Sequence, residues 1–191
     1  MKIPMNTTFP TLCATLLALA AGPALAHITL EQPEAVAGSA YKAVLRVGHG
    51  CDGSPTTRIT VLLPEGLRGA HPSPKPGWLL ETRKAPLAQP YESHGRRITE
   101  DVVEVRWTAR SEEHWLRDEW YDEFVLRGQL PAMSAPTAAP AALWFKVRQD
   151  CAQGQWDWAQ VPEAGVSTQG LKAPAVRLLL RAAPGDGGHA H

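Results

Sequence analysis

Short runs of β-type residues recur along the chain, and almost no stretch has the spacing of an amphipathic helix. Within the runs, apolar and polar residues alternate with the two-residue period of half-buried strands. Turns rich in glycine and proline, which number 16 and 17 of 191 residues, separate the runs. This pattern predicts an all-β fold, an antiparallel sandwich of about seven to nine strands. The expected strands are residues 27–31, 40–47, 57–63, 78–82, 98–108, 121–130, 143–149 and 173–182.

The connections between these runs are less regular. Residues 69–77 are rich in proline and should form an extended connection on the surface. Residues 84–97 are polar and predict an irregular loop or a loose hairpin, and residues 112–120 fit one short helical turn. Residues 133–142 are a loop of alanine and proline, and residues 184–191 have no apolar anchor, so we expect a disordered tail.

The first 26 residues have the parts of a secretory signal. A positive residue, an apolar run of about a dozen residues and an Ala-x-Ala site ending at Ala26 follow one another. Cleavage there would make His27 the first residue of the mature protein. The apolar run is too short to span a membrane, which takes roughly 20 residues. We therefore predict a signal peptide at 1–26, one domain at 27–183 and a tail at 184–191, located in the periplasm or secreted, with no membrane span.

The charges are balanced, with 19 basic and 19 acidic residues. This balance gives no electrostatic reason to expect nucleic acid or an anionic membrane as a partner. Two cysteines remain after cleavage, Cys51 and Cys151. In an oxidising compartment such a pair predicts a disulfide, and the alternative is a pair of soft metal ligands.

Several short motifs follow one another in a characteristic order. They are AHIT at 26–29, QPE at 32–34, HGC at 49–51, LPEG at 63–66, PKPGW at 74–78, LP at 130–131 and QDCAQG at 149–154, followed by Trp158. In this order they resemble the YcnI-like family of exported copper-binding domains, over most of the chain from His27 to about residue 165. The resemblance implies an immunoglobulin- or cupredoxin-like sandwich. It also implies one Cu(II) ion held by the amine and imidazole of His27 in a monohistidine brace. Glu34 would complete the coordination, with Trp158 packed close to the metal.

Elementary chemistry agrees with a copper site at His27. An α-amine has a pKa of about 7.7 to 8, so Cu(II) can displace its proton near neutral pH. Nitrogen donors favour Cu(II) over the other divalent first-row ions. Glu31 is the alternative carboxylate, on the strand face of His27 but about 13 Å along the strand. Trp156 is the alternative to Trp158.

The other histidines have simpler interpretations. His49 lies beside Cys51, and we expect it to make a structural hydrogen bond rather than to bind metal. The isolated histidines, which we expect to be solvated, are His71, His94 and His114. His189 and His191 lie on the tail and would collect a metal only weakly.

The predicted function is to hold Cu(II) for copper trafficking or homeostasis, with other copper-handling proteins of the periplasm as partners. We expect no enzyme activity. Copper enzymes that cleave polysaccharides oxidatively also begin with a histidine, but they need a second one, and the sequence alone does not indicate which it would be. A secreted interaction module without metal is the remaining alternative.

Overall fold

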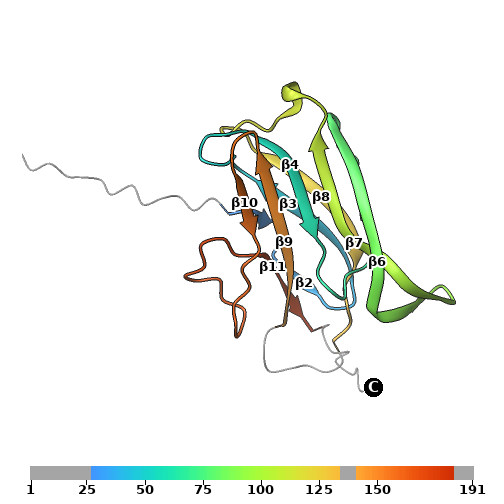
Figure 1. The fold of residues 1–191 in the computed structure, drawn as a ribbon. Helices are drawn as coiled ribbons and strands as arrows, with labels where there is room; N and C mark the ends of the chain where they lie inside the picture. Colours follow the sequence, from blue (N-terminus) through green and yellow to red (C-terminus); the bar gives the residue numbers. More distant parts are fainter. Residues whose placement is uncertain (1–26, 134–140, 183–191) are drawn as a thin grey trace, which may run out of the picture.

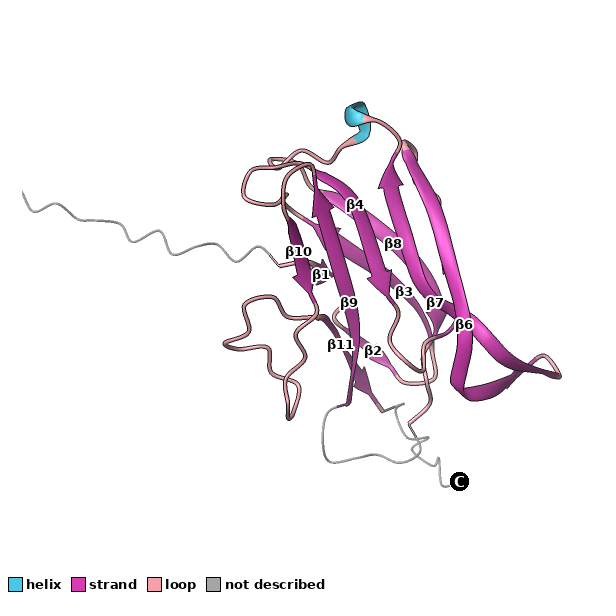
Figure 2. Ribbon diagram, viewed as in Figure 1, coloured by secondary structure: helices cyan, strands magenta, loops and turns pink. Residues whose placement is uncertain are grey.

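The computed structural model describes residues 27–133 and 141–182, which fold as two β-sheets packed face to face (Figures 1 and 2). The elements are β1 (Thr29–Leu30), β2 (Glu34–Val36), β3 (Ala40–Val47), β4 (Thr56–Leu62), β5 (Arg68–Pro72), β6 (Trp78–Ser93), β7 (Arg96–Ala109), the 3₁₀ turn η1 (Glu112–His114), β8 (Asp122–Gln129), β9 (Ala141–Cys151), β10 (Gln155–Trp158) and β11 (Val176–Arg181). The predicted all-β sandwich is confirmed, and its described residues form eleven strands rather than the seven to nine expected.

The two sheets differ in size and in their connections. The smaller has the order β1-β3-β8-β5, and the larger has the order β2-β11-β9-β4-β7-β6. The strand β10 pairs with the last residues of β9, and β11 pairs with its first residues. Since β4 runs along the other edge of β9, β10 and β11 lie end to end on one edge. The pairing of β2 with β11 is parallel, whereas the other ladders are antiparallel.

The core lies between the sheets and is built from their inward-facing side chains. Ile28 and Leu30 are buried and Thr29 is exposed, as the alternation in residues 27–31 predicts. Phe124 on β8 meets Trp78 and Trp107 of the opposite sheet edge-on, with ring centroids 5.1 and 5.6 Å apart. Aromatic pairs in this geometry add stability beyond the area that they bury, so these contacts join the two sheets.

Two connections are more regular than predicted, and one matches its prediction. Residues 84–97 are mostly regular, because β6 and β7 form one long hairpin that extends past the other strands (Figure 1). The proline-rich connection after Gly66 contains an edge strand, β5, which ends at Pro72, as edge strands tolerate proline. The short helical turn predicted within residues 112–120 is present as the three-residue η1.

The short strands β2 and β10 were missed by the sequence analysis, because three or four residues are too few to display a period. Residues 1–26 and 184–191 lie outside the described part of the chain, as does most of the predicted loop 133–142. Within the described part, no helix is long and apolar enough to cross a membrane.

Candidate metal centre

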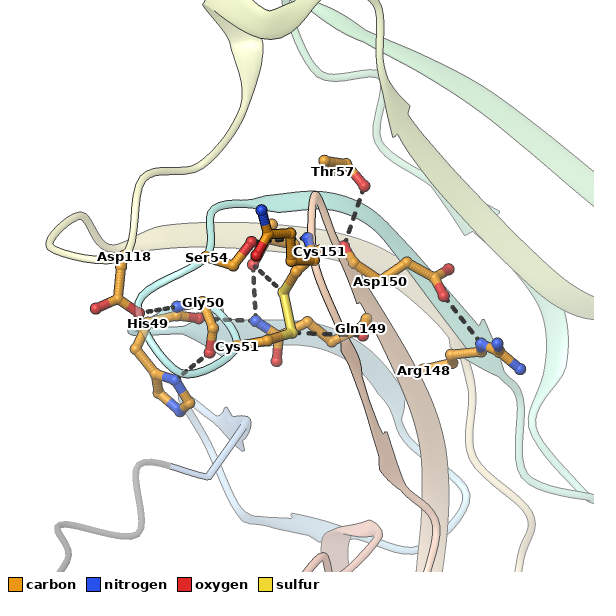
Figure 3. Close-up of a disulfide and its surroundings, with 12 residues drawn as sticks. His49, Gly50, Cys51, Ser54, Thr57, Asp118, Arg148, Gln149, Asp150 and Cys151 are labelled. Carbon is orange, nitrogen blue, oxygen red and sulfur yellow. Dashed lines mark hydrogen bonds and ion pairs between the residues drawn. A yellow bond between two sulfur atoms is a disulfide. The ribbon is translucent and has the colours of Figure 1, made fainter.

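A disulfide closes one end of the sandwich. Cys51 and Cys151 are bonded, with their Cα atoms 6.0 Å apart across 100 residues of chain, as predicted (Figure 3). The bond joins the loop at 48–55, between β3 and β4, to the end of β9. We call residues 48–55 the His49 loop. Cys51 and Ser54 also exchange two backbone hydrogen bonds of 2.9 Å, so the loop makes a tight turn at the disulfide.

Gly50 lets the His49 loop pack closely against its neighbours. A Cβ atom at Gly50 would lie 1.9 Å from the carbonyl oxygen of Ser54, a distance that no side chain can accept. The amide of Gly50 donates to Oδ1 of Asp118 at 2.8 Å, and Figure 3 shows this contact beside His49. Glycine is therefore required here for close approach rather than for a special backbone angle.

The side chain of Gln149 joins the His49 loop to β10. Gln149 is fully buried on β9, and its Nε2 donates to the carbonyl of His49 and to Oγ1 of Thr56, both at 2.7 Å. Its Oε1 accepts a 3.1 Å hydrogen bond from the indole Nε1 of Trp158. Both amide N–H donors and the carbonyl are thus satisfied, as a buried polar group requires. One side chain fixes the indole and the loop together.

Two imidazoles contact the indole that Gln149 holds. The His27 ring lies edge-on to Trp158 with centroids 5.6 Å apart, and the His49 ring does so at 6.3 Å. Trp156 stacks on Trp158 at 5.4 Å. We call His27, His49, Trp156 and Trp158 the ring cluster. Trp158, rather than Trp156, is the tryptophan in contact with His27, and it is 3% exposed.

The predicted carboxylates are held by arginines. Glu34 begins β2, opposite Leu179 of β11, and its carboxylate pairs with Arg181. Glu31 pairs with Arg46 at 2.9 Å. The structure therefore brings His27 and Trp158 together. The carboxylate of Glu34 is in an ion pair with Arg181. Both carboxylates lie in exposed ion pairs, which are weak enough to exchange partners.

The donors gathered in the ring cluster are nitrogens. Over residues 27–133 and 141–182, no three side chains of His, Cys, Asp and Glu form a metal-binding group. A site at His27 would not need three such side chains, because the α-amine of a processed N-terminus is itself a donor. An amine and imidazoles form a nitrogen-rich set that suits Cu(II). The buried indole would provide an apolar wall beside the ion.

Gln149 and the position of the His49 ring were missed in the sequence analysis. A signal for Gln149 exists, because Phe145, Val147 and Gln149 share the inward-facing positions of one strand. A polar side chain at such a position must find buried partners. For the His49 ring no comparable signal exists, since its contact with Trp158 joins residues more than 100 positions apart. The predicted structural hydrogen bond is present, between Nδ1 of His49 and the carbonyl of Gly50.

Comparison with known proteins identifies relatives of uncharacterised function. A family model described as a domain of unknown function (DUF1775) matches residues 27–180. An uncharacterised protein from Nocardia farcinica, whose crystal structure reveals an immunoglobulin-like fold, is 26% identical with a TM-score of 0.58. The match covers 81% of this chain and 97% of that one. No curated protein matches the chain.

Two cohesins are more distant structural neighbours. A non-cellulosomal cohesin from Archaeoglobus fulgidus has 10% identity and a TM-score of 0.38, covering 86% of this chain and 98% of its own. The seventh ScaB type I cohesin from Pseudobacteroides cellulosolvens has 8% identity and a TM-score of 0.40, covering 86% and 97%. At these scores the cohesins carry no functional argument.

Proposed function

The chain belongs to the DUF1775 family, the domain of the YcnI-like proteins, and on this premise we propose that it is an exported Cu(II)-binding protein. The observation that carries the proposal is the contact between the His27 ring and the buried indole of Trp158. The family match starts at His27, the residue that signal cleavage would expose. These two facts support an N-terminal histidine as the principal copper ligand.

In this proposal the α-amine and the imidazole of His27 hold the ion together. Chelation by one residue needs no movement of the sandwich, and β1, which pairs with β3, begins two residues after His27. The protein would hold and hand over copper in the periplasm or outside the cell, without turnover. Glu34 stays the predicted oxygen ligand, and it would have to exchange Arg181 for the ion.

The test is to block the α-amine while leaving the imidazole in place. The full chain is expressed in a host with a secretion pathway, and the first residue of the purified protein is verified by mass spectrometry. A variant carries Ala-Pro between Ala26 and His27. Proline is chosen because a residue with an amide N–H before His27 would create a new copper chelate. Cu(II) affinity is measured by competition with a chelator, and the ligand set by electron paramagnetic resonance.

We expect one Cu(II) per mature chain and an affinity at least about 100-fold lower for the extended variant. An extended variant that binds as tightly as the mature protein would refute binding through the His27 amine. The unextended variant His27→Ala keeps an α-amine and lacks the imidazole, and it should be similarly weakened. Thermal unfolding of the copper-free variants shows whether the fold is retained.

A copper-dependent oxidative enzyme is the second candidate, favoured by one observation. Such enzymes need a second histidine, and His49 lies against the same indole as His27. Reductant-dependent oxygen consumption by the copper-loaded protein in the presence of a polysaccharide would support this candidate. Consumption no faster than that of the His27→Ala variant would favour simple binding.

A further inference from the structure

The ring cluster contains a second imidazole, that of His49. His27 starts the described chain and His49 lies in the loop after β3, yet both rings contact the one indole of Trp158. We propose that His49 is a ligand of the Cu(II) ion that His27 holds, so that the site has three nitrogen donors. The donors are the α-amine and imidazole of His27 and the Nε2 atom of His49. This inference rests on the proposed function and refines its ligand set.

The hydrogen bond at Nδ1 gives the His49 ring the tautomer that a ligand needs. The partner of Nδ1 is the carbonyl oxygen of Gly50, which can only accept, so Nδ1 must carry the proton. In the neutral ring the lone pair then belongs to Nε2. Metal-binding histidines commonly donate their other N–H to a carbonyl or a carboxylate in this way, which fixes the ring and increases its basicity.

The backbone that carries the His49 ring is held in place from three sides. Its own carbonyl accepts from Gln149, the next amide donates to Asp118, and the residue after that is the disulfide-bonded Cys51. Gln149 also holds the indole against which the ring lies. A ligand fixed before the metal arrives loses little conformational entropy on binding, so the surroundings of His49 are those of a preorganised donor.

The direction of the ring agrees with this assignment. In Figure 3 the His49 side chain points away from the disulfide, toward the side on which the described chain begins. The two ring contacts put the His27 and His49 imidazoles against the same buried indole.

His94 offers a matched control on the same protein. It lies at the tip of the β6–β7 hairpin, is exposed, and has a left-handed backbone with φ of 48°. Removing the His94 imidazole deletes one possible surface copper ligand without touching the ring cluster. A difference between the His49 and His94 variants therefore reports on the position of the histidine and not on the number of histidines.

The experiment compares the processed full chain with His49→Gln, His49→Ala and His94→Ala, using Cu(II) alone as the probe. Glutamine keeps a polar side chain of similar reach in case the alanine variant folds poorly, and circular dichroism checks both. For each His49 variant we expect about 100-fold weaker Cu(II) binding at unchanged 1:1 stoichiometry. The nitrogen hyperfine pattern should also change from three donors to two. His94→Ala should match the unsubstituted protein in affinity and spectrum.

Two outcomes would overturn the proposal, and they are distinct from a failure of the His27 site. A His49→Gln protein with the affinity and spectrum of the unsubstituted protein would show that His49 is not a ligand. An equal loss in His49→Gln and His94→Ala would show weak surface binding only. If instead the Ala-Pro extension ahead of His27 has no effect, the proposed function itself fails, whatever the His49 variants do.

Discussion

Two buried polar side chains, Gln149 and Asp101, organise opposite ends of the sandwich. Gln149 makes hydrogen bonds to His49, Thr56 and Trp158. The carboxylate of Asp101 accepts from the amide of Gly69 and the hydroxyl of Tyr91, both at 2.7 Å, and from its own neighbour's amide. The β4–β7 register runs from Arg58 opposite Thr108 to Leu62 opposite Glu104, so Asp101 lies beyond the far end of β4.

At both ends one buried polar side chain makes several hydrogen bonds, but the groups that it positions differ. Each buried group gathers backbone and side-chain atoms from segments distant in sequence. At the Asp101 end the result is a long hairpin, with Arg68 stacked 4.9 Å over Tyr91. At the Gln149 end a neutral amide and a disulfide hold the ring cluster. A buried polar side chain with several hydrogen bonds therefore does not by itself indicate a binding site. The chemistry of the groups that it positions gives that indication.

The largest expected effect comes from removing the disulfide. The Cys51→Ala/Cys151→Ala double variant should lose up to about 4.7 kcal/mol of stability, the chain-entropy limit for a loop of this length. Copper affinity should fall as well, because the His49 loop loses its covalent anchor. Guanidinium denaturation and copper competition measure the two effects. Unchanged copper affinity in the folded double variant would show that the loop is held without the disulfide.

Gln149→Ala should have the next largest effect. It leaves the His49 carbonyl, the Thr56 hydroxyl and the Trp158 indole without their buried partner, at a cost of about 3 kcal/mol. The matched variant Asp101→Ala should also destabilise the fold, by about 2 kcal/mol. Copper affinity should fall at least about tenfold in Gln149→Ala only. Equal copper affinities in the two folded variants would remove the functional distinction between the two ends.

Alkaline pH should weaken the Asp101 end selectively. Burial and the hydrogen bond to Asp101 raise the pKa of Tyr91, whereas an unfolded tyrosine titrates near pH 10. The folded protein then holds its proton while the unfolded chain loses it, so stability is present below pH 10 and declines above it. The amide of Gln149 does not titrate. We expect Tyr91→Phe to reduce the loss of unfolding free energy between pH 9 and pH 11.

Tyr41, which is buried, is a second tyrosine that should add to this pH effect. Burial, aided by Glu31, raises its pKa to about 12, and its hydroxyl donates to the carbonyl of Gln32. Tyr41→Phe should therefore also reduce the alkaline loss, by up to about 2 kcal/mol. A double variant with both changes should show the flattest profile. If neither single variant changes the slope above pH 10, the tyrosines do not govern alkaline stability.

The smallest expected effect on stability is that of Glu34→Gln. The ion pair with Arg181 is exposed, so its loss should cost about 0.5 kcal/mol or less. The copper spectrum is the sharper measurement. A changed spectrum would support Glu34 as the predicted oxygen ligand, whereas a change in Glu31→Gln alone would assign the oxygen ligand to Glu31.

The sequence predicted the strands wherever one face of a run is buried. Residues 40–47 and 121–130 alternate clearly, and they appear as β3 and β8. The hairpin tip was harder to predict because most side chains of β6 are exposed or half-buried on both faces, which removes the alternation. Its stability comes from pairing with β7 and from Asp101, and neither is visible in a local pattern.

By itself the sequence determined the sandwich, the cysteine pair and the histidine that a signal cleavage would expose. These three predictions follow from the two-residue alternation, the composition and the signal-like first 26 residues, which are local properties of the sequence. The family resemblance indicated Trp158, with Trp156 as the alternative, and the tertiary structure showed that His27 meets Trp158 and that His49 lies against the same indole. Both contacts depend on the β9–β10 register, on Gln149 and on closure of a 100-residue loop. Such long-range pairings are set by the packing of the whole domain, so the local residue pattern left Trp156 and Trp158 as alternatives and gave no indication of the His49 contact.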